Sequence, residues 1–177
     1  IASIINNTTF CIHGGLGKKL DNIENINKLI QRPIDNFEDC KLLSDALWCD
    51  PTDCPEGSYI PNPRGRGNLF NNRAVSMFLK NNNLKRMIRA HECVEAGVLK
   101  IFDDKCITVF SASAYDNLNF NKSGILQIFE HDDSIKITSF PPLDRLKKSE
   151  TTYYKVQSLN NKEDKKHVYF SLMHPRL

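Results

Sequence analysis

The stretch Thr8-Thr9-Phe10-Cys11-Ile12-His13-Gly14-Gly15 decides how the first half of this chain is organised. Its first six residues are mostly β-branched or apolar, which is typical of a strand, and the two glycines predict a tight turn. A histidine that ends a strand beside glycines is well placed to face a cleft, because glycine lets the backbone approach a ligand closely. His13 is therefore the first candidate functional residue.

A second histidine repeats this arrangement. The apolar residues Met87 and Ile88 predict a strand over residues 86–90, and His91 follows it directly. Imidazole is a common metal ligand, but a histidine at a strand end is most often only a polar terminus. The residues alone leave both interpretations open.

A glycine-bearing loop carries two arginines, Arg64 and Arg66, within the sequence Asn62-Pro63-Arg64-Gly65-Arg66-Gly67. The planar guanidinium group suits a phosphate, although such a loop is usually only a solvated turn. The whole segment 50–72 is rich in Pro, Gly, Asp and Asn and is predicted to be irregular; long irregular segments in compact domains tend to be functional. These patterns by themselves indicate a phosphate or metal site and no more.

Hydrophobic periodicity predicts helices first and strands later. The predicted helices cover residues 22–30, 37–48 and 73–79, and Asn71 or Asn72 is the expected cap of the last one. Two strand pairs are then predicted, at 97–102 with 106–111 and at 125–130 with 135–140. This order, with mostly antiparallel connections, predicts an α+β or layered α/β fold with a β-sandwich core.

The chain has 177 residues, the size of one domain. We expect the domain proper to cover residues 1–142 and to end at Pro141-Pro142. Residues 143–177 are expected to be a Lys- and Ser-rich, partly ordered extension with one β-like run at 167–173. Because the chain begins Ile1-Ala2-Ser3 without a signal-peptide pattern, we expect it to be a piece of a longer protein.

The composition excludes several classes of function. A formal net charge of +3 is too weak to argue for nucleic acid, and no apolar stretch approaches the roughly 20 residues that a membrane span requires. The six cysteines fit neither a paired zinc signature nor a small disulfide scaffold. We therefore expect them to be reduced, and the protein to be cytoplasmic or nuclear.

Five strings in the chain resemble, in order and spacing, the motifs of the PPP family of metal-dependent serine/threonine protein phosphatases. The resemblance covers roughly residues 8–140, which corresponds to the C-terminal half of a calcineurin-like catalytic domain. The strings are FCIHGGL at 10–16, like F-x-x-HGGL; LWCDP at 47–51, like LLWSDP; NPRG at 62–65, like N-x-RG; MIRAHE at 87–92, like IRAH or IRSHE; and VFSASAY at 109–115, like FSAPNY.

Within that family, the arginine loop at 64–70 is most similar to the RGGG-x-x-F sequence of the phosphatases that carry EF-hands. The strings His91-Glu92-Cys93 and FSAS favour the same subfamily. No EF-hand loop of the D-x-D-x-D-G type is present in the chain. The resemblance therefore implies that any calcium-binding segment lies outside it.

The resemblance also implies roles for five residues. His13 and His91 match the two histidines that bind one metal of a dinuclear centre, for which Mn, Fe or Zn are the expected ions. Arg64 matches the arginine that holds the substrate phosphate, and Tyr115 matches a phenol that contacts the phosphate or a water. Asp50 matches an acidic residue that lines the site and orients its neighbours.

The implied activity is hydrolysis of phosphoserine and phosphothreonine in proteins. In the family, two metals activate a bridging water, which attacks phosphorus in line, while the metals and arginines stabilise the developing charge. A nucleophilic side chain is not needed, and no Ser-His-Asp arrangement or P-loop is visible in the sequence.

The family's GDxHG, GDxVDRG and GNHE motifs do not occur in this chain. These motifs supply the other metal ligands, a second phosphate-binding arginine and a histidine that protonates the leaving group. The chain alone is therefore expected to bind metal weakly and not to catalyse. The expected partners are phosphoprotein substrates, the N-terminal half of the catalytic domain, and a regulatory subunit or calcium-binding segment.

Some residues depart from the family pattern. Gly17-Lys18 replaces Ser-Pro after the first motif, Ser113-Ala114 replaces Pro-Asn before Tyr115, and Asp116 replaces Cys or Tyr after it. None of these changes removes a ligand, but they bear on inhibitor sensitivity and substrate preference. A pseudophosphatase or regulatory fragment that does not catalyse alone is the second hypothesis, and a domain with accidental motif matches is the third.

Overall fold

The computed structural model describes residues 1–30, 33–34, 40–115, 120–143, 149, 153–155 and 169–171. Contacts within the chain group residues 1–142 into one compact unit and residues 143–177 into a second. The larger unit contains all the predicted site residues. Within the smaller unit, β11 (Tyr153–Lys155) pairs antiparallel with β12 (Tyr169–Ser171). The rest of the β-like run predicted at 167–173 lies outside the described residues.

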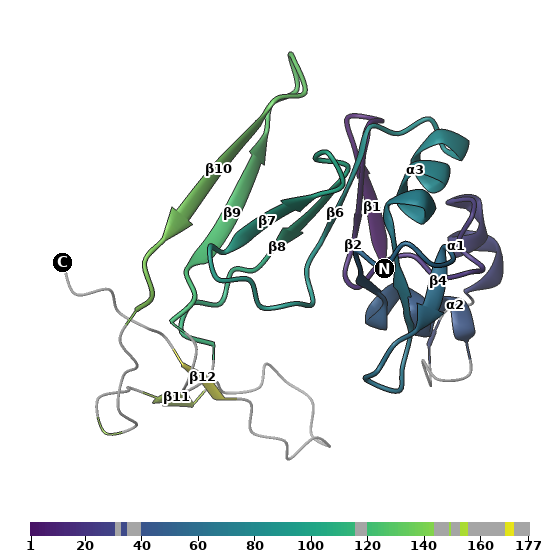
Figure 1. Ribbon diagram of the computed structural model, residues 1–177. Helices are drawn as coiled ribbons and strands as arrows, with labels where there is room; N and C mark the ends of the chain where they lie inside the picture. The colour runs from purple at the N-terminus through teal and green to yellow at the C-terminus, as the bar shows by residue number, and fades with distance from the viewer. Residues whose placement is uncertain are drawn as a thin grey trace. The chain divides into compact units, whose positions relative to one another are not determined.

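A five-stranded mixed sheet forms the centre of the larger unit (Figure 1). Its strands lie in the order β1 (Ala2–Ile5), β2 (Thr9–Ile12), β6 (Arg86–Arg89), β8 (Cys106–Val109) and β7 (Val98–Ile101). The three inner strands β2, β6 and β8 are parallel, whereas β1 and β7 pair antiparallel at the edges.

The mixed α/β fold is confirmed, and five of the eight strand pairings among the described residues are antiparallel, as predicted; the inner strands of this sheet are among the exceptions. The chain passes from β2 to β6 through a long crossover that contains α1, α2 and α3, and such a crossover permits parallel pairing. The edge strand β1 was not predicted, since its exposed Ile4 and Ile5 interrupt the apolar alternation of a half-buried strand.

Three helices, α1 (Glu24–Leu29), α2 (Lys41–Trp48) and α3 (Asn72–Asn81), gather beside β1 and β2 (Figure 1). The hydrophobic core joins them to the sheet: Phe10 of β2 and Met87 of β6 are fully buried against helix residues such as Phe78. The predicted helices at 22–30 and 73–79 are confirmed. Of the helix predicted at 37–48, residues 37–39 lie outside the described residues.

Asn71 is the N-cap of α3, which decides between the two caps that the sequence allowed. Its Oδ1 accepts a hydrogen bond from the backbone N–H of Ala74 at 3.2 Å. Its Nδ2 donates to the carbonyl oxygens of Cys54, at 3.1 Å, and Gly57. One buried amide therefore starts the helix and holds the preceding loop against it.

The sequence predicted that the segment 50–72 is irregular throughout, and this prediction is wrong in part. It contains a small three-stranded sheet in the order β3 (Asp50–Pro51), β5 (Asn68–Phe70) and β4 (Tyr59–Pro61). Strands of two or three residues are too short to show a period-two pattern, so composition indicated only turns. The sheet fixes both ends of the arginine loop, because β4 and β5 flank it.

Both predicted strand pairs are confirmed. Strands β7 and β8 form an antiparallel hairpin, and β9 (Ser123–Ile128) pairs antiparallel with β10 (Ile135–Phe140). Gly97, with a φ of 77°, allows the two pairs to approach, since a Cβ there would lie 2.5 Å from the carbonyl carbon of Ser123.

Replacing Asn71 by Ala in the native full-length protein should lower the free energy of unfolding by roughly 1–3 kcal/mol, because the cap and two loop contacts disappear together. Urea unfolding measures the change. The matched control is Asn72→Ala at the neighbouring exposed position, which should cost less than about 0.5 kcal/mol. Equal losses in the two variants would contradict the assignment of Asn71 as the cap.

Candidate functional site

His13 and His91 lie side by side because their strands are parallel neighbours. His13 directly follows β2, and His91 follows β6 after Ala90, so both leave the sheet at the same edge. The backbone N–H of Ala90 donates to the carbonyl oxygen of His13 at 3.0 Å. The centroids of the two imidazole rings are 5.2 Å apart, with the planes at 67°.

His91 has a strained backbone and a largely buried ring. Its φ of 65° lies in the left-handed region, which a residue other than glycine adopts at a cost of roughly 1–3 kcal/mol. The side chain is 11% exposed and packs edge-on against Trp48, with ring centroids 5.1 Å apart. The cluster therefore holds His91 in a conformation that local preferences disfavour.

Burial is the main reason why the pKa of His91 lies below its ordinary value. The charge of Asp50 opposes this shift, while the nearby cations Arg89 and Arg64 and the ring of His13 reinforce it. The neutral imidazole is consequently favoured, and that is the form that binds a metal ion.

Asp50, at the start of β3, is 3% exposed and accepts contacts from several directions. Its Oδ2 accepts from Asn62 Nδ2 at 3.0 Å and lies 3.3 Å from Arg64 Nε. Its Oδ1 lies 2.8 Å from Arg89 Nη2 and 4.0 Å from His91 Nε2. Asp50 thus lies at the centre of one charged cluster, and its orienting role stays a prediction.

Arg64 joins the loop to the histidines. Its side chain is 47% exposed, and Nη1 lies 3.4 Å from His91 Nε2. The loop beneath it is held by the bond from Arg64 N to Asn62 Oδ1, at 2.9 Å, and by Gly67, which has a φ of 69°. A Cβ on Gly67 would lie 2.5 Å from the Trp48 carbonyl oxygen, so only glycine fits this close approach.

Arg89 completes the cluster and was missed as a functional candidate. Its side chain is fully buried, and it donates to the carbonyl oxygens of Gly14, at 2.6 Å, and Cys49, at 3.1 Å. It also forms ion pairs with Asp50, at 2.8 Å, and Glu92, at 2.7 Å. Burial is the first cause that raises the pKa of Glu92, although the Arg89 charge opposes it.

A strand pattern could not have revealed Arg89, because arginine is among the residues least often buried. The one signal in the sequence that could have indicated a functional role for Arg89 was its position two residues before His91, a candidate metal ligand.

Tyr115 is placed apart from these contacts in the described part of the chain. Its side chain is exposed, its ring packs edge-on against Phe110 at 5.0 Å, and its N–H donates to Asn121 Oδ1 at 3.0 Å. Asp116, the departure from the motif that follows it, lies outside the described residues. The predicted role of Tyr115 therefore stays a prediction.

The two imidazoles fit half of a metal site. Both rings converge at one edge of the sheet, and His91 favours its neutral form, which is the donor that Mn, Fe and Zn accept. Among the residues that the structure describes, no group of three or more His, Cys, Asp or Glu side chains could hold a metal ion. The described residues therefore bring together two candidate ligands, whereas a closed metal site usually has about four.

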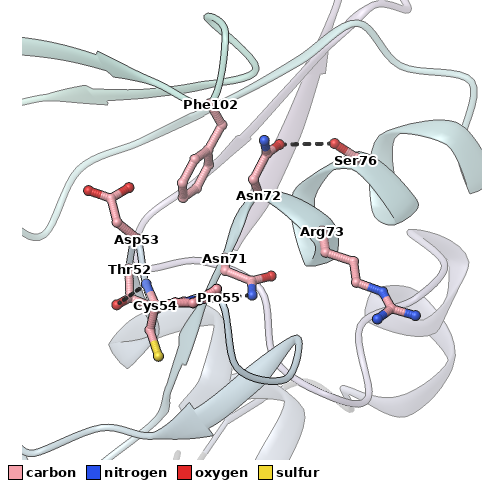
Figure 2. A pocket seen from close by; sticks show the side chains of 9 residues that line it. All are labelled: Thr52, Asp53, Cys54, Pro55, Asn71, Asn72, Arg73, Ser76 and Phe102. Carbon is pink, nitrogen blue, oxygen red and sulfur yellow. Dashed lines mark hydrogen bonds between the residues drawn. The ribbon is translucent and has the colours of Figure 1, made fainter.

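A cavity of about 540 Å³ lies elsewhere in the unit, where the loop after β3, the start of α3 and the β7–β8 turn meet (Figure 2). Its lining contains none of the five predicted site residues. The charged cluster and this cavity are therefore formed by different residues. The residues that line the cavity are Thr52, Asp53, Cys54, Pro55, Asn71, Asn72, Arg73, Ser76 and Phe102.

Comparison with known proteins supplies the family. Residues 1–95 match the model of the calcineurin-like phosphoesterase family. The chain is 36% identical over 128 residues to the serine/threonine-protein phosphatase 4 catalytic subunit of Saccharomyces cerevisiae, a match that covers 72% of the chain and 40% of that protein. It is 34% identical over 131 residues to the serine/threonine-protein phosphatase PP2A-like PPG1 of Candida albicans, over 72% and 30% of the two chains.

A solved structure is similar as well. It is a protein serine/threonine phosphatase from Saccharomyces cerevisiae with similarity to human phosphatase PP5, with a TM-score of 0.65 and 27% identity. The match covers 82% of this chain and 48% of that one. The chain thus spans less than half the length of these relatives.

Gly67→Ala should destabilise the native full-length protein more than Gly65→Ala, by at least about 1–2 kcal/mol. Both glycines have a positive φ, but a Cβ at Gly65 meets nothing within 4 Å. The comparison therefore separates the steric contact with Trp48 from the shared backbone strain. Urea unfolding of the two variants is the measurement, and equal losses would mean that the loop does not rest on Trp48.

Proposed function

Because this chain belongs to the calcineurin-like phosphoesterase family, and within it to the PPP-type serine/threonine phosphatases, we propose that it supplies part of an active site that hydrolyses phosphoserine and phosphothreonine in proteins. The observation that carries the proposal is the meeting of His13, His91, Arg64 and Asp50 in one cluster. These residues come from distant segments of the sequence, so their convergence is a property of the fold.

The proposed cofactor is a pair of metal ions, with Mn, Fe or Zn as candidates. His13 and His91 would hold one of them through neutral imidazole nitrogens. When bound, the pair supplies Lewis-acid activation of a water and neutralises charge that develops on the phosphate. The remaining ligands are proposed to come from the N-terminal half of the catalytic domain, which the motifs GDxHG and GNHE would identify.

Arg64 is the proposed phosphate-binding residue of this chain. Its side chain is exposed enough to reach a substrate, while the ion pair between its Nε and Asp50 Oδ2, at 3.3 Å, restrains its orientation. The planar fork suits a bidentate contact with two phosphate oxygens, and its Nη1 lies 3.4 Å from His91 Nε2, beside the proposed metal ligands. Tyr115 is proposed as a second phosphate contact on the resemblance of its motif alone.

Phosphoproteins are the proposed substrates. A regulatory subunit or calcium-binding segment is a further proposed partner, on the likeness of the arginine loop to that of the EF-hand-bearing phosphatases. All six cysteines are thiols rather than halves of disulfides, which supports a cytoplasmic or nuclear location. None of the helices in the described part of the chain is long and apolar enough to cross a membrane.

A pseudophosphatase is the second candidate function. The observation that favours it is the lack, in the described residues, of a third ligand beside the two histidines. Such a protein would keep the phosphate-binding loop and would hold partners without turnover.

Replacing His91 by Ala in the native full-length protein should remove about one bound metal per molecule and lower phosphatase activity at least about 100-fold, because a two-metal site depends on both ions. Metal analysis and hydrolysis of an aryl phosphate are the measurements. His131→Ala is the matched control, since this histidine is 75% exposed in the turn between β9 and β10. Unchanged metal content in the His91 variant would refute its role as a ligand.

The 177-residue chain alone should bind manganese weakly and show no turnover of an aryl phosphate. Mixing it with a separately produced N-terminal half should restore activity if that half supplies the remaining ligands. Turnover by the chain alone near that of a complete domain would overturn the proposed division of the site.

A further inference from the structure

We propose that Arg89 is a positioning residue, which sets the Asp50 carboxylate and thereby aims Arg64 at the substrate phosphate. The inference rests on the proposed function, since it concerns the same phosphate-binding arginine. Neither the family motifs nor the comparisons assign Arg89 a role.

Each acceptor of Arg89 lies at or beside a predicted site residue. Gly14 follows His13, Glu92 follows His91, and Cys49 precedes Asp50, which is itself an acceptor. A single side chain thus contacts three of the four segments that carry His13, Asp50, Arg64 and His91, the exception being the Arg64 loop. An arginine with only a packing role would not be expected to have all of its acceptors at or beside predicted site residues.

Burial restricts the geometry of the ion pair between Arg89 and Asp50. The Arg89 side chain has no exposed surface, and that of Asp50 is 4% exposed. A buried charge that loses its partner cannot be rescued by water, so the geometry of this pair is strongly held. Glu92, with 32% of its side chain exposed, is the looser of the two carboxylate partners.

The link from Arg89 to Arg64 passes through the two oxygens of one carboxylate. Arg89 Nη2 holds Oδ1 at 2.8 Å, which fixes the rotation of the carboxylate plane. Oδ2 is consequently presented to Asn62 Nδ2 and to Arg64 Nε. The Arg64 side chain is 47% exposed, and its Nε lies 3.3 Å from Oδ2 of this buried carboxylate, so the position of the carboxylate constrains the direction of Arg64.

Arg89→Lys tests the proposal, because lysine keeps the charge but has one nitrogen in place of the fork that reaches four acceptors. The measurement is the affinity of the native full-length protein for inorganic phosphate, by calorimetry at fixed metal content. We expect R89K to weaken phosphate binding roughly tenfold in the wild-type background. In an Arg64→Ala background the same change should have less than about a twofold effect, because no aimed guanidinium remains to be lost.

Arg86→Lys is the matched control. Arg86 lies on the same strand, β6, is 13% exposed, and pairs with Asp133 away from the cluster. It should leave phosphate affinity within about twofold in both backgrounds. A similar loss from R89K in both backgrounds would show that Arg89 supports only the fold, and no loss in either would show that Arg64 needs no such support; each result overturns the proposal.

If R89K does not accumulate as folded protein, Glu92→Gln replaces it, since it weakens the hold on Nη1 of Arg89 while the guanidinium stays in place. We then expect a loss of roughly threefold that again requires Arg64. An equal loss with and without Arg64, or none, overturns the proposal. Phosphate binding also separates the two ideas: the proposed function fails if the wild-type protein binds phosphate but hydrolyses no phosphopeptide, and the positioning role can still hold.

Discussion

The parallel pairing of β2 with β6 is the constraint on which the rest of the site depends. Two segments far apart in the sequence, at 9–12 and 86–89, run in the same direction as neighbours, so the residues that follow them leave the sheet together. The hydrogen bond between Ala90 and His13 continues the pairing beyond the strands. Antiparallel pairing would have placed the two histidines at opposite edges, and no side-chain adjustment could have joined them.

Charge balance determines what can be packed behind those histidines. Two carboxylates, Asp50 and Glu92, meet two guanidinium groups, Arg89 and Arg64, in a largely buried space. The buried half of this arrangement is rigid because its groups cannot exchange their partners for water. The exposed half, Arg64, can exchange its partners for a ligand. Within a few side chains, the cluster thus changes from buried groups that keep their partners to an exposed arginine that can bind a ligand.

The sequence could predict those parts of the fold that have a period. The amphipathic α3 and the alternation in β9 and β10 were found because several residues repeat one signal. Strands of two or three residues, such as β3 and β5, carry too few positions for a pattern, and the direction of strand pairing is not encoded in any single strand. The histidines could be nominated from their local setting, but only motif order assigned Asp50 a place. Arg89 was missed because burying an arginine depends on acceptors from segments far away in the chain.

At position 91, the left-handed backbone favours a different residue for stability than the proposed metal site requires. Glycine, and to a lesser degree asparagine, adopts a φ of 65° more readily than histidine does, so either would relieve strain here. Neither would supply an imidazole. A redesign of this chain guided by folding energy alone would therefore choose to discard the very side chain on which the proposed metal site rests, and any engineering for thermal robustness would have to hold residue 91 fixed.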